Sequence, residues 1–254
     1  MTIRMLMCFL LFASSTCFGG EIDEALARAG LVESKIPEGD AWYTANRSSL
    51  SYVIANDAGQ LTIKELKNFH RPPDTRVTFN GKSLTGGNRG EWGGGLSVAD
   101  PDGTEHILIR QNIVQLIPEK DELFVFTGLA HLGAARGAIY KVTSDKEGLN
   151  AEKVTLLPGA PQVVAIERND RGYFGFLVIT NDGLVSFSPK FSEMKVLAID
   201  QFWSGLYPTS ALLLDSQLII GMRSGVAVVS MGQGISVSSG PRVAKIQYFS
   251  KKEQ

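Results

Sequence analysis

A repeated strand-turn-strand unit is the feature that most constrains the fold of this chain. Each unit has an apolar run, a short turn, and a glycine followed at once by a second β-prone run, as in residues 176–179 and 183–187. The glycines are spaced by 36, 42, 46 and 42 residues, and they are Gly59, Gly95, Gly137, Gly183 and Gly225. A period of about 40 to 50 residues is typical of β-propeller blades.

Further strand candidates flank these units. Apolar runs precede three of the units, at 114–117, 163–166 and 211–214, and outer runs lie at 106–109, 154–157 and 195–198. Each unit therefore predicts up to four strands, which is the content of one blade. Several middle strands are apolar on both sides, as expected of a sheet covered on both faces.

Over residues 40–249 these units resemble the repeats of β-propeller proteins. The shared pattern is an apolar strand, a polar turn, Gly-Leu or Gly-Val, and a second strand, and it identifies no particular family. The WD dipeptide and the Asp-box are absent. The resemblance implies an all-β fold, a single β-propeller with five blades and a short N-terminal helix. Six blades, with a partial one in residues 21–48, and a β-sandwich are the alternatives.

The first twenty residues have the layout of a secretory signal peptide. Arg4 precedes an apolar run at 5–12, and small residues lead to Gly19 and Gly20. The run is shorter than the ~20 residues that span a bilayer, and no other segment is long enough. We expect cleavage after Gly19 or Cys17 and a periplasmic or secreted protein without a membrane span. A lipoprotein acylated at Cys17 is the alternative.

Both cysteines, Cys8 and Cys17, lie in that segment. The mature chain is therefore expected to have no disulfide and no cysteine nucleophile.

The ends of the mature chain lie outside the repeats. Residues 21–39 predict a short helix and a linker, and residues 250–254 are expected to fray. Residues 244–249 predict a last strand that could pair with an N-terminal strand around Trp42 and Tyr43 and so close the ring.

Charge and motifs exclude several functions. The 25 Lys and Arg residues nearly balance 26 Asp and Glu residues, so we expect no nucleic-acid partner. Gly81-Lys82-Ser83 lacks the earlier glycine of a phosphate-binding loop, because position 76 is Arg76. The three histidines, His70, His106 and His131, have no metal-ligand spacing. We expect no metal, no cofactor and no catalytic residue.

The binding hypothesis rests on one rim of the propeller. The turn between the two middle strands of a blade and the connection to the next blade open on the same rim. The rim is expected to carry the polar turns Asn56-Asp57, Asn88-Arg89, His131 and Asn181-Asp182. Its aromatic and guanidinium candidates are Trp42, Arg47, Arg89, Arg136, Trp203, Tyr207 and Arg223.

Such side chains suit a protein or glycan ligand. We therefore expect a non-catalytic binding or scaffold module that recognises an envelope protein or a glycan, an inhibitor or immunity protein being one specific form. Aromatic side chains that wedge between blades are the structural alternative.

A hydrolase acting on polysaccharide is the alternative function. It would need two carboxyl groups about 5 to 10 Å apart. The candidates are Asp57, Glu91, Asp182 and Asp215. Asp57 and Asp182 lie in turns, where Asp is favoured for backbone reasons.

Overall fold

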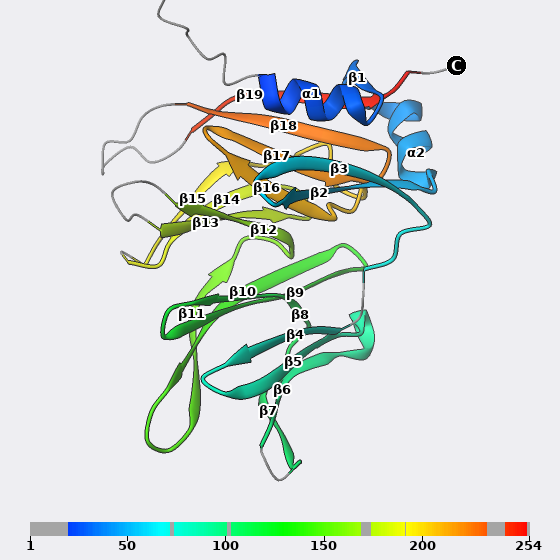
Figure 1. Ribbon diagram of the computed structural model, residues 1–254. Coiled ribbons are helices and arrows are strands. Elements are labelled where there is room, and N and C mark those ends of the chain that lie inside the picture. The colour runs from blue at the N-terminus through cyan, green and yellow to red at the C-terminus, as the bar shows by residue number, and fades with distance from the viewer. Residues whose placement is uncertain are drawn as a thin grey trace, which may run out of the picture.

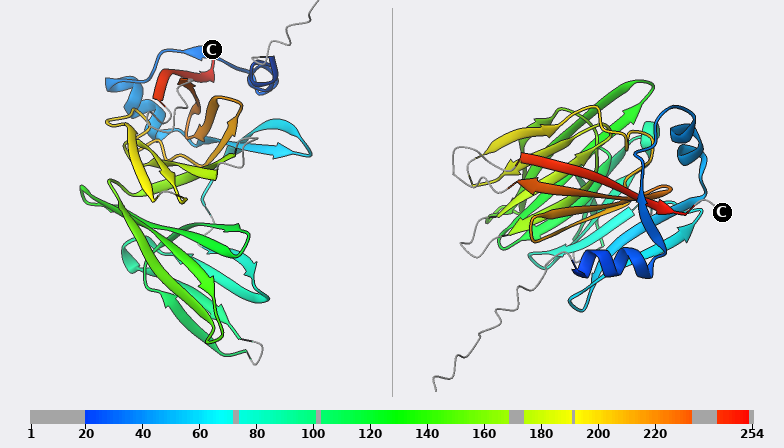
Figure 2. Two further views of the ribbon diagram at one scale, coloured as in Figure 1. Left: turned by 90° about the vertical axis from the view of Figure 1, so that its left-hand side faces the viewer. Right: turned by 90° about the horizontal axis from the view of Figure 1, so that it is seen from above.

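The computed structural model describes residues 20–71, 74–100, 103–168, 174–190, 192–232 and 242–252. The expected signal peptide therefore lies outside the described residues, apart from Gly20. The described strands form five antiparallel sheets. Figures 1 and 2 show these sheets one above another, with that of β4–β7 at one end.

Three of the sheets have four strands each, in chain order. The first contains β4 (Asp74–Phe79), β5 (Lys82–Asn88), β6 (Gly94–Ala99) and β7 (Glu105–Ile109). The second contains β8 (Ile113–Glu119), β9 (Glu122–His131), β10 (Ala134–Ser144) and β11 (Leu149–Leu157). The third contains β12 (Pro161–Arg168), β13 (Phe174–Thr180), β14 (Leu184–Ser188) and β15 (Glu193–Ala198).

The remaining two sheets depart from four strands. The fourth contains β16 (Ser210–Leu214), β17 (Gln217–Met222), β18 (Gly225–Gly232) and β19 (Arg242–Lys251), with β1 (Leu31–Ser34) added beside β19. The fifth has only β2 (Leu50–Asp57) and β3 (Gln60–Lys67). The helices are α1 (Gly20–Arg28), α2 (Gly39–Arg47) and the short 3-10 helix η1 (Gly90–Trp92).

Neighbouring sheets pack through their first strands. Strand β4 lies against β8, β8 against β12, β12 against β16, and β16 against β2. Between β8 and β12, the Gln115 side chain makes two hydrogen bonds to the main chain of Val164. Gln115 Nε2 donates to the Val164 oxygen at 3.1 Å, and the Val164 N–H donates to Gln115 Oε1 at 3.0 Å. No comparable packing joins β2 to β4 in the part of the chain that the structure describes.

Apolar side chains fill each interface between sheets. Between the second and third sheets, for example, the ring of Phe176 lies 5.0 Å from those of Phe124 and of Phe126. Because each inner sheet is covered on both faces, its middle strands, such as β13 and β14, are buried on both sides. The predicted propeller architecture, with five sheets as blades, is confirmed.

The chain ends meet differently from the expectation. Strand β19 pairs with β1, in a register from Leu31 opposite Lys251 to Ser34 opposite Tyr248. The expected strand around Trp42 and Tyr43 is wrong, because both residues lie in α2. The region 21–39, expected to be a helix and a linker, also contains the strand β1. Residues 250–254 were expected to fray, but β19 continues through residues 250 and 251, which pair with β1.

The first repeat is also corrected. It has two strands, and β2 packs against β16 and β17 as the first strand of a blade. The turn at Gly59 therefore joins the first and second strands of its sheet, whereas the other four glycines belong to hairpins of the second and third strands. In the second repeat, the strand before Gly95 is β5, and Glu91 and Trp92 lie in η1.

Helix α1 covers the open edge of this small sheet (Figure 2). The Leu61 main-chain N–H donates to Glu21 Oε1 at 2.9 Å, and Arg28 Nη2 donates to the Leu61 oxygen at 3.3 Å. These side chains supply the bonds that a third strand would have made, which protects the edge.

Candidate functional site

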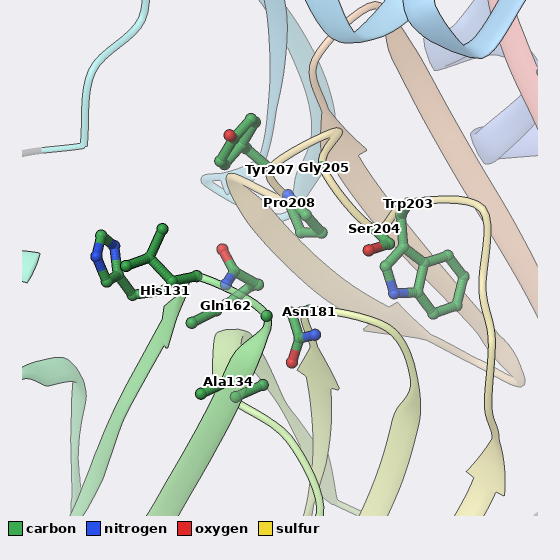
Figure 3. Close-up of a pocket in the computed structure, with 13 residues that line it drawn as sticks. His131, Ala134, Gln162, Asn181, Trp203, Ser204, Gly205, Tyr207 and Pro208 are labelled. Carbon is green, nitrogen blue, oxygen red and sulfur yellow. The ribbon is translucent and has the colours of Figure 1, made fainter.

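The expected rim contains a cavity of about 300 Å³, which we call the rim cavity. It lies between the β9–β10 turn, the start of β12, the β13–β14 turn and the loop 203–208 (Figure 3). Its lining residues are Ala130, His131, Leu132, Gly133, Ala134, Ala135, Gln162, Asn181, Trp203, Ser204, Gly205, Tyr207 and Pro208.

Helix α2 fixes the loop 203–208. The Trp42 indole Nε1 donates to the main-chain oxygens of Phe202 and Ser204, each at 3.1 Å. Asn46 Nδ2 donates to the Gly205 oxygen at 2.6 Å. Because both side chains come from one helix, the loop is positioned by an element far away in the sequence.

The β17–β18 turn fixes the end of this loop. The Arg223 main-chain N–H donates to the Leu206 oxygen at 2.8 Å. The Arg223 guanidinium lies 4.6 Å from the centre of the Tyr207 ring and donates through Nη1 to the Asn46 oxygen. Such cation–π contact orients the half-exposed Tyr207 ring at the cavity mouth.

Trp203 forms the buried wall of the rim cavity. Its side chain is fully buried in the core between the third and fourth sheets. Among the described residues, its indole Nε1 has no hydrogen-bond partner. Figure 3 shows this nitrogen on the side of the ring that faces Asn181.

The orientation of the Asn181 amide is set by the preceding connection. Its Oδ1 accepts from the Ala160 N–H at 2.9 Å, and its main-chain N–H donates to the Ala160 oxygen at 2.8 Å. The Nδ2 group, which can only donate, is therefore the end left to face the cavity.

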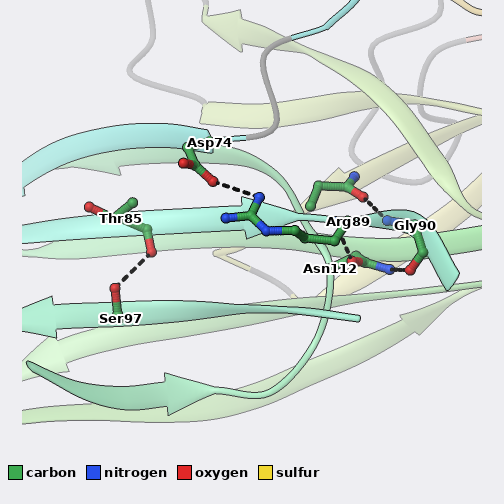
Figure 4. A network of polar contacts seen from close by, with 7 residues as sticks. Asp74, Thr85, Arg89, Gly90, Ser97 and Asn112 are labelled. Atoms are coloured by element: carbon green, nitrogen blue, oxygen red, sulfur yellow. Dashed lines mark hydrogen bonds and ion pairs between the residues drawn. The ribbon is translucent and has the colours of Figure 1, made fainter. Parts of the chain in front are cut away.

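A second cavity, of about 170 Å³, lies beside η1 on the same rim. Glu91, Arg110, Asn112 and Arg136 are among its lining residues. Asn112 accepts from the Arg89 N–H at 3.1 Å and donates to the Gly90 oxygen at 2.6 Å (Figure 4). His131 Nε2 lies 2.8 Å from Glu91 Oε2 and so links the two cavities.

The predicted site residues separate into groups. Trp203 and Tyr207 line the rim cavity, with Arg223 behind Tyr207, whereas Arg136 lines the second cavity.

The other three predicted residues lie outside both linings. Trp42 holds the loop from beneath, Arg89 pairs with Asp74 at 3.0 Å (Figure 4), and Arg47 is exposed at the end of α2. The expectation that Asn56-Asp57 shares the rim is wrong. It is Ser51, at the opposite end of β2, that lies at this rim, where it forms a β-bridge with Arg223.

Sequence reasoning missed Gln162 and Asn112. Gln162 is near the start of β12, and in the sequence nothing distinguishes it from an ordinary strand residue. Asn112 comes just before β8 and belongs to no recognisable motif. The exposure of Leu132, at 91%, was also unforeseen, since an apolar residue in a hairpin turn gives no signal of its function.

Neither cavity brings two of the four carboxylate candidates together. Glu91 pairs with His131, Asp57 pairs with Lys64 at 2.8 Å, and Asp215 lies in the β16–β17 turn at the other rim. The rim cavity lining has no carboxylate, and the second cavity has only Glu91. The described residues contain no cluster of three or more His, Cys, Asp or Glu that could hold a metal ion.

Comparison with known proteins gives structural likeness only. No family model and no curated protein matches the chain. A luciferin-regenerating enzyme has 10% identity and a TM-score of 0.46, with 80% of this chain and 78% of that chain covered. An α-L-arabinanase of Penicillium chrysogenum has 13% identity and a TM-score of 0.32, with 81% and 86% covered.

A third structure is an aldose sugar dehydrogenase of Streptomyces coelicolor in its PQQ-bound form. It has 9% identity and a TM-score of 0.25, with 68% of this chain and 81% of that chain covered. We take no activity or ligand from any of the three. The class defined by the sheets themselves is a propeller-like all-β protein. In its described part, no helix is long and apolar enough to cross a membrane.

Proposed function

We propose that this protein is an exported, non-catalytic binding module that holds an envelope protein or a glycan at the rim described above. The observation that carries the proposal is the rim cavity itself. Exposed Leu132 and Tyr207, at 91% and 55%, stand beside a fully buried Trp203. Exposed apolar side chains gathered at the mouth of a cavity are a feature of recognition sites.

The chemistry of the rim cavity supports binding over catalysis. His131 is the one titratable side chain among its lining residues apart from the Tyr207 phenol. A nucleophilic mechanism would need a hydroxyl beside this base. Figure 3 places His131 and Ser204 on opposite sides of the cavity.

Export is supported by residues 1–20 alone. Protein recovered from the periplasmic fraction of the producing bacterium, or from its medium, should begin between residues 18 and 21. Helix α1, which covers β3, would then start the mature chain. An intact N-terminus in the cytoplasmic fraction would contradict export and leave the binding proposal to be judged by the next experiment.

Binding is tested by cross-linking and recovery from envelope extract. The rim variant combines Leu132→Asp with Tyr207→Ala, both exposed, because Trp203 is fully buried and its replacement would disturb the core. The matched control combines Ile107→Asp with Val196→Ala, each 50% exposed on an outer strand.

We expect wild type and control to recover the same partner and the rim variant to lose it. Equal recovery by all three would remove the rim from the proposal. Recovery of no partner would contradict the binding function.

A further inference from the structure

Two arginines without an ion-pair partner line the second cavity, the one beside η1. Arg110 and Arg136 are both exposed, and neither takes part in an ion pair within the described residues. By contrast, Arg89 on the same rim is held by Asp74 at 3.0 Å (Figure 4). A guanidinium stays charged throughout the range of pH in which proteins fold. Arg110 and Arg136 are therefore free to turn toward a bound anion.

The floor of the second cavity is fixed by the main chain around Asn112. This residue is buried, and its main-chain oxygen accepts from the Gly128 N–H at 3.0 Å. Its side chain bonds to the main chain on both sides of η1, as Figure 4 shows. A Cβ added at Gly94 would come within 2.6 Å of Asn112 Oδ1, so the packing here is close. The segment 110–112 and η1 are thus held together, and the cavity is already formed without a ligand.

The side chains that line the second cavity carry a net positive charge. Arg110 and Arg136 contribute two positive charges, and Glu91 contributes one negative charge. Glu91 Oε2 lies 2.8 Å from His131 Nε2, and no ion pair joins Glu91 to either arginine. With a neutral His131 the balance is one positive charge.

This charge decides the class of ligand, because hydrogen bonding alone does not. The Gln111 amide and the carbonyl groups of the lining can accept as well as donate, so they suit many polar groups. One carboxylate balances one positive charge. A phosphate group carries nearly two negative charges, and its excess charge would lie beside Glu91.

Exposed apolar side chains flank the second cavity. Trp92 follows Glu91 in η1 and is 85% exposed, and Leu132 follows His131 and is 91% exposed. The contact between Glu91 and His131 brings these two turns side by side. The Leu132 side chain has no polar group to offer a sugar hydroxyl, whereas it suits an apolar side chain of a peptide.

We propose that the second cavity binds an acidic segment of a protein partner by holding one of its carboxylates between Arg110 and Arg136. Trp92 and Leu132 contact the apolar side chains next to that carboxylate. Guanidinium and carboxylate groups form charge-assisted hydrogen bonds, which are stronger than bonds between neutral groups. The inference rests on the proposed function and specifies the chemistry of the partner surface at this part of the rim.

The test is an NMR titration of the ¹⁵N-labelled protein. The signals followed are the Trp92 indole N–H, assigned through Trp92→Phe, and the main-chain amides of Gly93 and Gly94. The main probe is an acetylated, amidated pentapeptide of alanine and leucine with a central glutamate. The same peptide with a central glutamine, inorganic phosphate and glucuronate are the comparisons. We expect the glutamate peptide to shift these signals in a saturable way, and its affinity to fall as salt is raised.

Four variants separate charge from structure. Arg110→Gln and Arg136→Gln should each weaken binding of the glutamate peptide by about three- to tenfold, the modest loss that exposed charges give. Glu91→Gln removes the competing carboxylate and should tighten binding, which a residue with a purely structural role would not do. Arg76→Gln is the matched control, because Arg76 is exposed on β4 and lines neither cavity. It should bind as wild type does.

Several outcomes would overturn the inference. These are equal binding of the glutamate and glutamine peptides, unchanged affinity in both arginine variants, no tightening in Glu91→Gln, and no shift with any probe. Tighter binding of phosphate would replace the carboxylate by a phosphate ligand, and binding of glucuronate alone would replace the peptide by an acidic glycan.

Recovery from envelope extract separates this inference from the proposed function. If the double variant Arg110→Gln with Arg136→Gln recovers the partner as wild type does, while Leu132→Asp with Tyr207→Ala loses it, the binding function stands and this inference fails. If the glutamate peptide binds but no partner is recovered, the carboxylate site stands and the proposed function fails.

Discussion

The indole of Trp42 lies directly against the main chain of Gly205. A Cβ built on Gly205 would come within 2.7 Å of Trp42 Cζ2, and Gly205 has a φ of +75°. A glycine is required there for both reasons. Through this contact, a helix near the start of the chain shapes the loop that lines the rim cavity.

Gly205→Ala should therefore destabilise the protein by about 2–4 kcal/mol, from backbone strain together with overpacking. It should also shift the indole N–H resonance of Trp203 in a ¹H–¹⁵N NMR spectrum. Gly30→Ala is the control, because Gly30 has a φ of +69° with nothing within 4 Å of the added Cβ. Urea unfolding should show the smaller loss, about 1–2 kcal/mol, for Gly30→Ala. Equal losses would show that the Trp42 contact is unimportant.

Glu21→Ala should expose the edge of β3. The Leu61 N–H would lose its acceptor, while Leu61 itself stays fully buried, so the free energy of unfolding should fall by about 1–3 kcal/mol. Hydrogen exchange of the Leu61 amide should accelerate. Glu21→Gln retains an acceptor oxygen and should lose less. Unchanged exchange in Glu21→Ala would contradict the protective role of α1.

Glu167→Gln should stabilise the protein at neutral pH. Burial raises the pKa of the Glu167 carboxyl above its usual 4.5, and among the described residues its Oε2 has no partner. A raised pKa costs stability as pH rises through the window between the unfolded and folded values. The advantage of the variant, measured by urea unfolding from pH 4 to pH 7, should thus grow with pH. A constant difference would contradict this.

The neighbouring pair should show the opposite pH dependence. The Arg168 guanidinium hydrogen-bonds Glu119 through both nitrogens and holds the pKa of that carboxyl below its usual 4.5. The stability from this pair is present at neutral pH and lost as pH falls through the lowered pKa. Arg168→Gln should cost up to about 1 kcal/mol at pH 7, since Arg168 is half-exposed and solvent screens the pair.

That cost should shrink in acid and in high salt. Arg168→Lys keeps the positive charge but cannot make both hydrogen bonds to Glu119. Its stability should therefore lie between those of the wild type and Arg168→Gln. A loss that does not change with pH would point instead to the contact of Arg168 with the Phe174 ring, at 5.0 Å.

The strand pairs were predictable because their signals are local. A run such as 176–179 carries its own apolar pattern, and the glycine at 183 marks the turn that returns the chain as β14. The first repeat looked like the others for the same reason. Only packing shows that β2 is a first strand, because its identity depends on contacts with β16 and β17.

The rim was predictable in outline and not in detail. Trp203 and Tyr207 were found because aromatic residues stand out in a polar loop, but the sequence does not show that one is fully buried and the other exposed. Gln162 has no local signal at all, since its place in the rim cavity depends on how the second and third sheets pack.

What the sequence by itself determined is thus the set of strands, the period that makes them blades, and the rim to which most of their turns belong. These properties follow from apolar runs and glycine turns within about forty residues. The tertiary structure decided that Trp42 belongs to a helix that holds the loop 203–208, that α1 takes the place of a strand beside Leu61, and that Trp203 is fully buried while Tyr207 is half-exposed. These are contacts between distant segments, and their energies exist only once the sheets have packed.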